Sequence, residues 1–139
     1  MFRKILVPVS LNERASEIAE AAAELAQQHS ASLTLLHVIE EIEDLDGDET
    51  ESFYEGLRER AEASLDSWAA KLAERGLEVE REVLIGKRGP AIVRRAESLG
   101  CDLVVVGSHK VDPDDPTRSL GTTSHQVALM AGCHVLLVR

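Results

Sequence analysis

Two glycine-bearing segments near the end of the chain have residue types suited to holding a phosphate. The first begins at Gly107, directly after a short apolar run, and the second begins at Gly121 and continues with Thr122 and Thr123. A helix starting at these threonines would present free backbone N–H groups, which attract anions. The intervening loop begins at Lys110 and carries aspartates and prolines instead of further glycines. Whether this loop still accepts a phosphate is the main functional question that the sequence raises.

The elements that would position these segments alternate along the whole chain. Short apolar runs predict five strands, and apolar residues at three- and four-residue steps predict four helices between them. The expected strands are Lys4–Val9, Ser32–Ile39, Val79–Ile85, Asp102–Val106 and His134–Val138. The expected helices are Arg14–His29, Phe53–Leu72, Gly89–Leu99 and a last one that begins at Ser119 or Thr122 and ends at Gly132.

This alternation predicts a single α/β domain over residues 1–139. Strands joined by helices run parallel through right-handed crossovers, so we expect an open five-stranded parallel sheet with helices on both faces. Ligands in such sheets bind beyond the carboxyl ends of the strands, where the strand order reverses. The loops after Val9 and after Val106 are therefore the candidate site.

Finer features of these elements also follow from the sequence. The weak alternation of Val79–Ile85 predicts an exposed edge strand, and Asn12 is expected to cap the first helix. Pro90 suits the first position of the third helix, because proline lacks an N–H that this position does not need. In the last helix, Val127 and Met130 are expected to face inward.

Charge and composition exclude several kinds of partner. The chain has a formal net charge of −10, and eight carboxylates lie in the single run Glu40–Glu51, which leaves a net charge of −2 for the other residues. An acidic chain without a basic stripe is not expected to bind nucleic acid or an anionic membrane. No apolar run approaches the roughly 18 residues of a membrane helix, and Met1 leads straight into a strand. The cytoplasm is the expected location.

Two patterns in the sequence are compatible with a metal site, but each is explained more simply without a metal. The acidic run Asp44–Asp48 partly copies a calcium loop, but Glu49 stands where that loop requires glycine. The run is better explained as a solvated connection. His109 and His125 lie near the same loop and helix, but nothing in the sequence fixes their geometry. No metal site is therefore expected.

The remaining nucleophiles and histidines also favour structural interpretations. Cys101 and Cys133 each abut a predicted buried strand and lack a C-x-x-C spacing, so we expect inert thiols. Ser108 adjoins His109, but neighbouring residues of an extended segment point apart and no G-x-S-x-G turn is present. His37 ends a buried strand and is expected to be a hydrogen-bonded structural residue. No catalytic residue is predicted.

Five segments, in order and at suitable spacing, resemble the universal stress protein family over nearly the whole chain. Each one alone is a weak signal, but together they are strong. They are Ile5–Val9 (ILVPV), Leu35–Val38 (LLHV), Gly86–Ile92 (GKRGPAI), Cys101–His109 (CDLVVVGSH), and Gly121–Thr122 with Cys133–Arg139 (CHVLLVR).

The resemblance implies a flavodoxin-like, Rossmann-like sheet of strand order 3-2-1-4-5 and a homodimer paired through residues 135–138. It also implies a site for ATP or AMP, built from a Gly-x2-Gly-x9-Gly-Ser/Thr motif and an aspartate after the first strand. This chain departs from that pattern at three points. Ser10 replaces the aspartate, Lys110 replaces the second glycine, and the span from Gly107 to Gly121 is one residue too long.

These departures are expected to weaken binding of a triphosphate. A lysine at a backbone position that requires positive φ would cost about 1–2 kcal/mol. Three aspartates in the loop would repel a nearby phosphate, and Pro113 and Pro116 lack N–H donors. The candidate binding residues are Pro8, Val9, Ser10, Val38, Gly107, His109, Lys110, Gly121, Thr122 and Thr123.

The sequence therefore predicts a non-enzymatic, homodimeric stress-response protein that acts through contacts with an unidentified protein partner. No cofactor is expected, because nucleotide binding is weakened or lost. The alternative is a regulatory switch that binds ATP or AMP between the loops after the first and fourth strands. A metal-dependent regulatory module is a third hypothesis.

Overall fold

Five parallel strands form one sheet in the order β3-β2-β1-β4-β5, which confirms the predicted topology. The computed structural model describes residues 1–42, 47–119 and 121–139. The strands are β1 (Lys4–Pro8), β2 (Ser32–Glu40), β3 (Val79–Gly86), β4 (Leu103–Gly107) and β5 (His134–Val138). The helices are α1 (Ala15–His29), α2 (Asp48–Ala73), α3 (Arg88–Leu99) and α4 (Thr123–Met130), preceded by a 3₁₀ turn at Pro116–Ser119.

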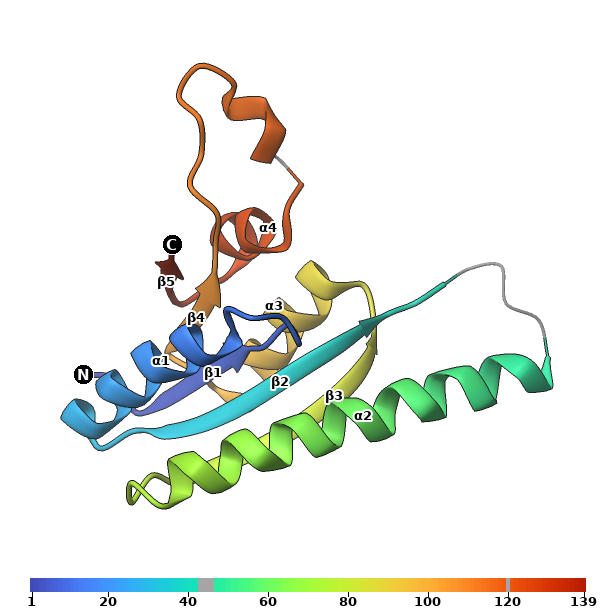
Figure 1. Ribbon diagram of the computed structural model, residues 1–139. Helices are drawn as coiled ribbons and strands as arrows, with labels where there is room; N and C mark the ends of the chain where they lie inside the picture. Colours follow the sequence, from blue (N-terminus) through green and yellow to red (C-terminus); the bar gives the residue numbers. More distant parts are fainter. Residues whose placement is uncertain (43–46, 120) are drawn as a thin grey trace.

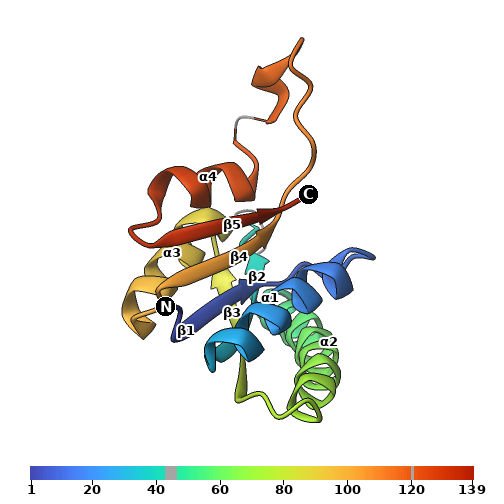
Figure 2. The same cartoon turned by 90° about the vertical axis from the view of Figure 1, so that its left-hand side faces the viewer.

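Helices α1 and α2 cover one face of the sheet, and α3 and α4 cover the other (Figure 1, Figure 2). Successive residues of a strand point to opposite faces, so each central strand contributes to both cores. Val7 and Val105 belong to the same buried core as Leu65 of α2, whereas Leu6 and Val104 on the same two strands belong to the core on the side of α3 and α4. Burial on both faces is why the sequence of these strands is continuously apolar.

Three details of the helices differ from the predictions: where α3 begins, how α1 is capped, and whether Met130 of α4 is buried. Helix α3 begins at Arg88, so Pro90 is its third residue; this is tolerated because the first-turn N–H groups have no partner within the helix. Asn12 does not cap α1, which begins at Ala15, although its side chain accepts a hydrogen bond from the backbone N–H of Arg14. Met130 is 46% exposed and does not face inward, because α4 covers only the sheet margin.

The chain leaves the sheet between β4 and α4. Residues 110–119, here called the arm, extend away from the strands and carry the 3₁₀ turn (Figure 1, Figure 2). The side chains of Asp112, Asp114 and Asp115 are exposed there. The Asp112 carboxylate accepts a hydrogen bond of 2.9 Å from the Asp114 N–H, which stabilises the turn at Pro113 and Asp114 just before the 3₁₀ turn.

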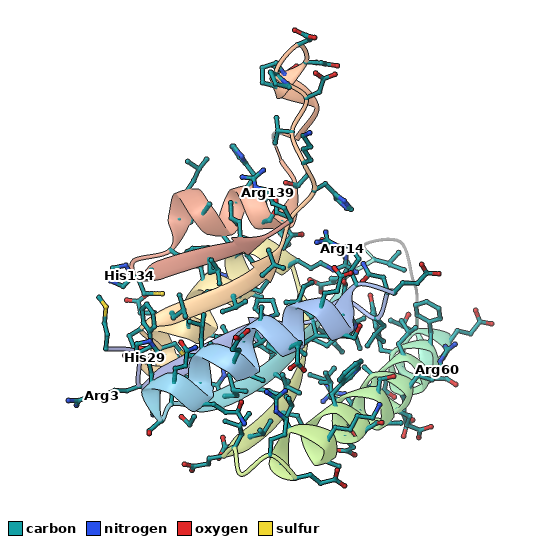
Figure 3. The ribbon with its side chains drawn as sticks, turned by 60° about the vertical axis from the view of Figure 1, so that its left-hand side comes forward. Arg3, Arg14, His29, Arg60, His134 and Arg139 are labelled. Atoms are coloured by element: carbon teal, nitrogen blue, oxygen red, sulfur yellow. The ribbon has the colours of Figure 1, made fainter. Side chains whose placement is uncertain are left out.

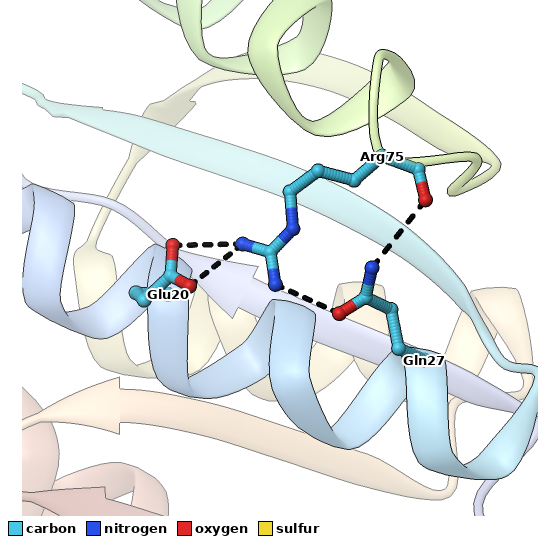
Figure 4. Close-up of polar contacts among 3 residues, drawn as sticks. All are labelled: Glu20, Gln27 and Arg75. Carbon is cyan, nitrogen blue, oxygen red and sulfur yellow. Dashed lines mark hydrogen bonds and ion pairs between the residues drawn. The ribbon is translucent and has the colours of Figure 1, made fainter.

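One arginine fastens the end of α2 to α1 on the outer surface. Arg75 Nη1 lies 2.7 and 2.8 Å from the two carboxylate oxygens of Glu20, and Nη2 donates to Gln27 Oε1 at 2.8 Å (Figure 4). This planar fork holds the two helices side by side over their shared core. Within the described ranges, no helix is both long and apolar enough to cross a membrane.

Asp102 joins the starts of the two central strands. Its carboxylate accepts hydrogen bonds from the Arg3 N–H (2.9 and 3.1 Å) and the Lys4 N–H (3.2 Å), and its own N–H donates to the Lys4 carbonyl (3.0 Å). Replacing Asp102 with alanine should lower the free energy of unfolding by about 1–2 kcal/mol, because two backbone donors lose a charged acceptor. Urea denaturation measures this loss.

The matched control is Asp66→Ala on α2. Asp66 also makes a short contact, 2.6 Å to Arg81 Nε, but its side chain is 59% exposed. Exposed ion pairs contribute about 0–1 kcal/mol, so this variant should stay close to the parent protein. Equal losses for the two variants would contradict the role assigned to Asp102.

Candidate functional site

A cavity of ≈ 280 Å³ opens at the carboxyl ends of β1 and β4. The chain leaves β1 for α1 on one face of the sheet and leaves β4 for α4 on the other face. The loops that follow β1 and β4 therefore diverge, as expected at the point where the strand order reverses. The cavity is lined by Pro8, Val9, Ser10, Asn12, Arg14, Ile18, Leu36, His37, Val38, Arg88, Ile92, Val106, Gly107, His109, Thr122, Thr123 and Ser124.

Most of the residues predicted from the sequence meet at this cavity. They come from the ends of β1, β2 and β4 and from the start of α4, which are far apart in the chain. Those that line it are Pro8, Val9, Ser10, Val38, Gly107, His109, Thr122 and Thr123. Two predicted residues, Lys110 and Gly121, are exposed and lie outside its lining.

The arm explains why Lys110 lies outside. The Ser108 N–H still bonds the Val138 carbonyl at 2.7 Å, so the chain follows β5 to this point and leaves the sheet only afterwards. Two expectations about the loop need correction. Among the described residues only Ser30 combines a side chain with positive φ, so Lys110 carries no such strain. None of the arm's aspartates lines the cavity, so they are not part of its wall.

Gly107 is required at its position by the packing of α1. A Cβ atom built there would collide with Ile18 Cδ1, and Ile18 is only 3% exposed and cannot move away freely. The turn from β4 into the cavity wall therefore depends on a residue without a side chain. This physical reason for the glycine could not be read from the sequence, because Ile18 is distant in the chain.

Arg14 joins the start of α1 to the ends of β4 and β5. Its Nη1 donates to the Ser108 carbonyl at 2.8 Å, and its Nη2 donates to the Val138 carbonyl at 3.1 Å. Glu17 lies 3.6 Å from its Nε on the first turn of α1. Figure 3 shows Arg14 at the end of the sheet from which the arm departs. One guanidinium thus holds the end of β4 against the end of β5.

Arg88 provides a second positive charge at the opposite wall. It is the first residue of α3, and its Nε lies 3.4 Å from both the Val38 carbonyl and the Glu40 carboxylate. Neither arginine was predicted from the sequence to line the site. Their positions in the sequence could have indicated them, because each arginine follows the carboxyl end of a strand and lies just before or in the first turn of the next helix.

His37 is the structural histidine that was predicted. Its Nδ1 lies 2.7 Å from the Val9 carbonyl, which can only accept, so Nδ1 carries the hydrogen. The contact holds the residue after β1 against the end of β2. Because this nitrogen donates, the neutral ring keeps Nε2 as an acceptor at the cavity.

Helix α4 starts at the edge of the cavity, directly after Thr122, which was one of its two predicted starting points. Thr122 is its cap, and its hydroxyl accepts from the His125 N–H at 3.4 Å. Ser124 is buried in the first turn, and its hydroxyl lies 3.4 Å from Ser108 Oγ. This first turn directs helix N–H groups and hydroxyls toward the side of the cavity near Gly107.

The other suggested chemistries find little geometric support. Ser108 Oγ contacts the carbonyl of His109, and no contact joins it to that residue's ring. No cluster of three or more His, Cys, Asp or Glu side chains suited to a metal forms among the described residues. Asp44 and Asp46, which belong to the calcium-like pattern, lie outside the described residues.

The two cysteines lie at the opposite end of the sheet, before β4 and β5. Both are partly buried and pack against the core on the α3 and α4 side. Burial raises the pKa of the Cys101 thiol, and the nearby Cys133 raises it further. The pKa of Cys133 is also raised by burial. A raised pKa lowers the thiolate fraction at neutral pH, in line with the low reactivity expected from the sequence.

Comparison with known proteins agrees with this fold. The chain matches the universal stress protein family over residues 1–139. Universal stress protein YxiE of Bacillus subtilis is 30% identical to it over 149 aligned positions, covering 100% of both chains. The structure of UspA from Lactobacillus plantarum matches with a TM-score of 0.81 and 24% identity, covering 99% of this chain and 98% of that one. That likeness shows the flavodoxin-like fold.

A further similar structure was solved with a bound nucleotide. The universal stress protein from Archaeoglobus fulgidus, in complex with dAMP, matches with a TM-score of 0.72 and 20% identity. The match covers 99% of this chain and 98% of that chain. At this identity the likeness shows the fold alone, and the nucleotide is a property of that protein.

Replacing Arg14 with alanine should loosen the ends of β4 and β5 together. Two carbonyl oxygens would lose charged donors, which costs about 1.5–3 kcal/mol for a hydrogen bond to a charged group. Hydrogen exchange of the Ser108 N–H, which bonds the Val138 carbonyl, should become faster than in the parent protein. Arg58→Ala on the exposed surface of α2 is the control and should leave this exchange unchanged.

Proposed function

We propose that this chain, which belongs to the universal stress protein family, is a non-enzymatic regulatory protein that binds an adenine mononucleotide of the AMP class. The cavity at the ends of β1 and β4 carries this proposal. Its volume of ≈ 280 Å³ lies near the lower end of small-ligand sites, which suits one nucleoside with one phosphate. The dAMP complex of the Archaeoglobus fulgidus protein supports the choice of ligand class.

The lining offers a suitable surface for each part of such a ligand. Apolar side chains from three strand ends, including Val38 and Val106, suit the faces of a base. Arg14 and Arg88 supply positive charge, and the first turn of α4 supplies N–H donors for a phosphate. These groups are preorganised by contacts within the protein, which lowers the cost of binding.

The same geometry favours a monophosphate over a triphosphate. Further phosphates would need donors beyond the first turn of α4, and the arm that could supply them extends away from the sheet. Pro113 and Pro116 have no N–H to offer, and three exposed aspartates would repel a longer phosphate chain passing near the arm. We therefore propose that ATP binding is weakened and that a smaller nucleotide is the physiological ligand.

The proposed role is regulatory and involves no chemistry. Hydrolysis would require an oriented base or a metal to activate water. Ser108 is held by contacts to a carbonyl and to Ser124, which suits a structural hydroxyl better than a nucleophile. Occupancy of the cavity would then be communicated to a protein partner.

A second part of the proposal concerns assembly. Strand β5 is an edge strand with one neighbour, β4, and Leu136 is 39% exposed on it. Unpaired strand edges with exposed apolar side chains are ready to pair with another strand. We propose that two copies associate across a two-fold axis through residues 135–138. Arg14, which contacts the Val138 carbonyl, would link the cavity to this interface.

The nucleotide proposal predicts a thermal shift with AMP that exceeds the shift with ATP. A ligand at 100 times its dissociation constant adds about 2.7 kcal/mol, which raises Tm on the order of 5–10 °C for a domain of this size. Arg88→Gln should reduce the AMP shift, because Arg88 lines the cavity. Arg94→Gln, on the same helix but outside the cavity lining, should retain it. No shift at millimolar AMP would refute the proposal.

The assembly proposal predicts that Leu136→Asp converts a dimer into a monomer, because a carboxylate would be buried at the shared edge. Analytical ultracentrifugation measures the change, and circular dichroism should show that the fold is retained. Phe53→Asp is the control, since Phe53 is also exposed (41%) but lies on α2. A dimer that persists in the Leu136 variant places the interface elsewhere.

A further inference from the structure

A second hollow lies at the other edge of the sheet, between β3 and α3. It is a groove of ≈ 730 Å³, larger and shallower than the cavity at the carboxyl ends of β1 and β4, and it shares no lining residue with that cavity. We call it the edge groove. Its lining residues are Glu41, Leu84, Ile85, Gly86, Lys87, Pro90, Ala91, Arg94, Arg95 and Ser98.

The floor of the edge groove is apolar. Leu84 of β3 and Pro90 and Ala91 of the first turns of α3 form this floor, and Ile85, whose side chain alternates in direction with that of Leu84, borders the groove at the strand edge. Ile85 is 39% exposed, which is a high value for a large aliphatic side chain in a strand. Burying such a side chain against a partner would contribute about 25 cal/mol per Å² of apolar surface removed from water.

The backbone of β3 presents unused hydrogen-bonding groups along this groove. Strand β3 lies at the end of the sheet and, in the part of the chain that the structure describes, pairs only with β2. The Glu78 and Gly86 carbonyls accept from β2, so the even-numbered residues of β3 face that strand. Because successive backbone groups alternate in direction, the N–H and C=O groups of Val83 and Ile85 point to the open side. An extended chain placed there could continue the sheet.

The walls of the edge groove are basic, although the chain as a whole is acidic. Lys87, Arg94 and Arg95 line it together with one carboxylate, Glu41. Arg95 is engaged by Glu82 at 2.7 Å. Lys87 and Arg94 are exposed, and neither side chain makes an ion pair with another described residue. On a chain of net charge −10, this concentration of positive charge is local to the groove.

We propose that the edge groove binds an extended acidic segment of a partner protein, which pairs with β3 as a sixth strand. The unused backbone groups would supply the pairing, the apolar floor would accept alternate side chains, and Lys87 and Arg94 would select carboxylates. Nucleic acid is disfavoured, because the floor is aliphatic and the chain carries a net charge of −10. From the chain's own acidic run Glu40–Glu51, Glu41 lines the groove, and the run then leads into α2, which covers the other face of the sheet. A partner protein is therefore the proposed source of the extended segment.

The test measures fluorescence anisotropy of a labelled peptide of alternating glutamate and valine, added to the full-length protein. We expect saturable binding that weakens with added salt, because exposed charges are screened. A peptide with lysine in place of each glutamate should not bind. Arg94→Glu should reduce affinity at least about tenfold, whereas Arg58→Glu on α2, which reverses an equally exposed charge, should leave it unchanged.

A second variant distinguishes strand addition from simple charge attraction. Ile85→Pro removes one outward N–H and no bond to β2, so the sheet should be retained, as circular dichroism can verify. Affinity for the acidic peptide should fall about tenfold relative to Ile85→Ala, which keeps the N–H. Equal affinity of these two variants, or binding of the lysine peptide, would overturn the proposal. Should Ile85→Pro fail to fold, an unchanged affinity of Arg94→Glu would overturn it as well.

Discussion

Burial of β1 and β4 on both faces is the constraint on which the rest of this structure depends. A strand covered on two sides must be apolar at every position, as Ile5–Val7 and Leu103–Val106 are. Two covering layers require crossover helices on opposite faces, and β1 is where the crossovers change sides. The loops at that point must separate, so a cavity there is a consequence of how the sheet is covered.

The walls of this cavity depend on contacts between residues distant in the chain. Arg14 from the start of α1 holds carbonyls at the ends of β4 and β5, while His37 holds the residue that follows β1. Gly107 lets α1 approach the end of β4, since any side chain would meet Ile18. The arm begins only after these contacts, so its charge and its prolines shape the surroundings of the cavity and not its wall.

The two edges of the sheet have different chemistry. At β5, the apolar side chain of Leu136 is exposed on the edge strand itself, which suits pairing with an identical strand. At β3, exposed Ile85 lies beside Lys87 and Arg94, which suits a partner of opposite charge. Since both edges leave backbone groups unpaired, the side chains around them must decide which strand is accepted.

The sequence by itself determined the order of strands and helices along the chain, their approximate bounds and about half of the cavity lining. Apolar periodicity is a local property, so β5 could be placed at His134–Val138 and Thr122 recognised as one of two starting points for α4. It could not place Lys110, because the direction in which the arm leaves the sheet is set by Ser108 pairing with the Val138 carbonyl. Nor could it identify Arg14 and Arg88, whose roles depend on carbonyls brought near them by folding. Only the tertiary structure decides these contacts, because they are made between residues that lie far apart in the sequence.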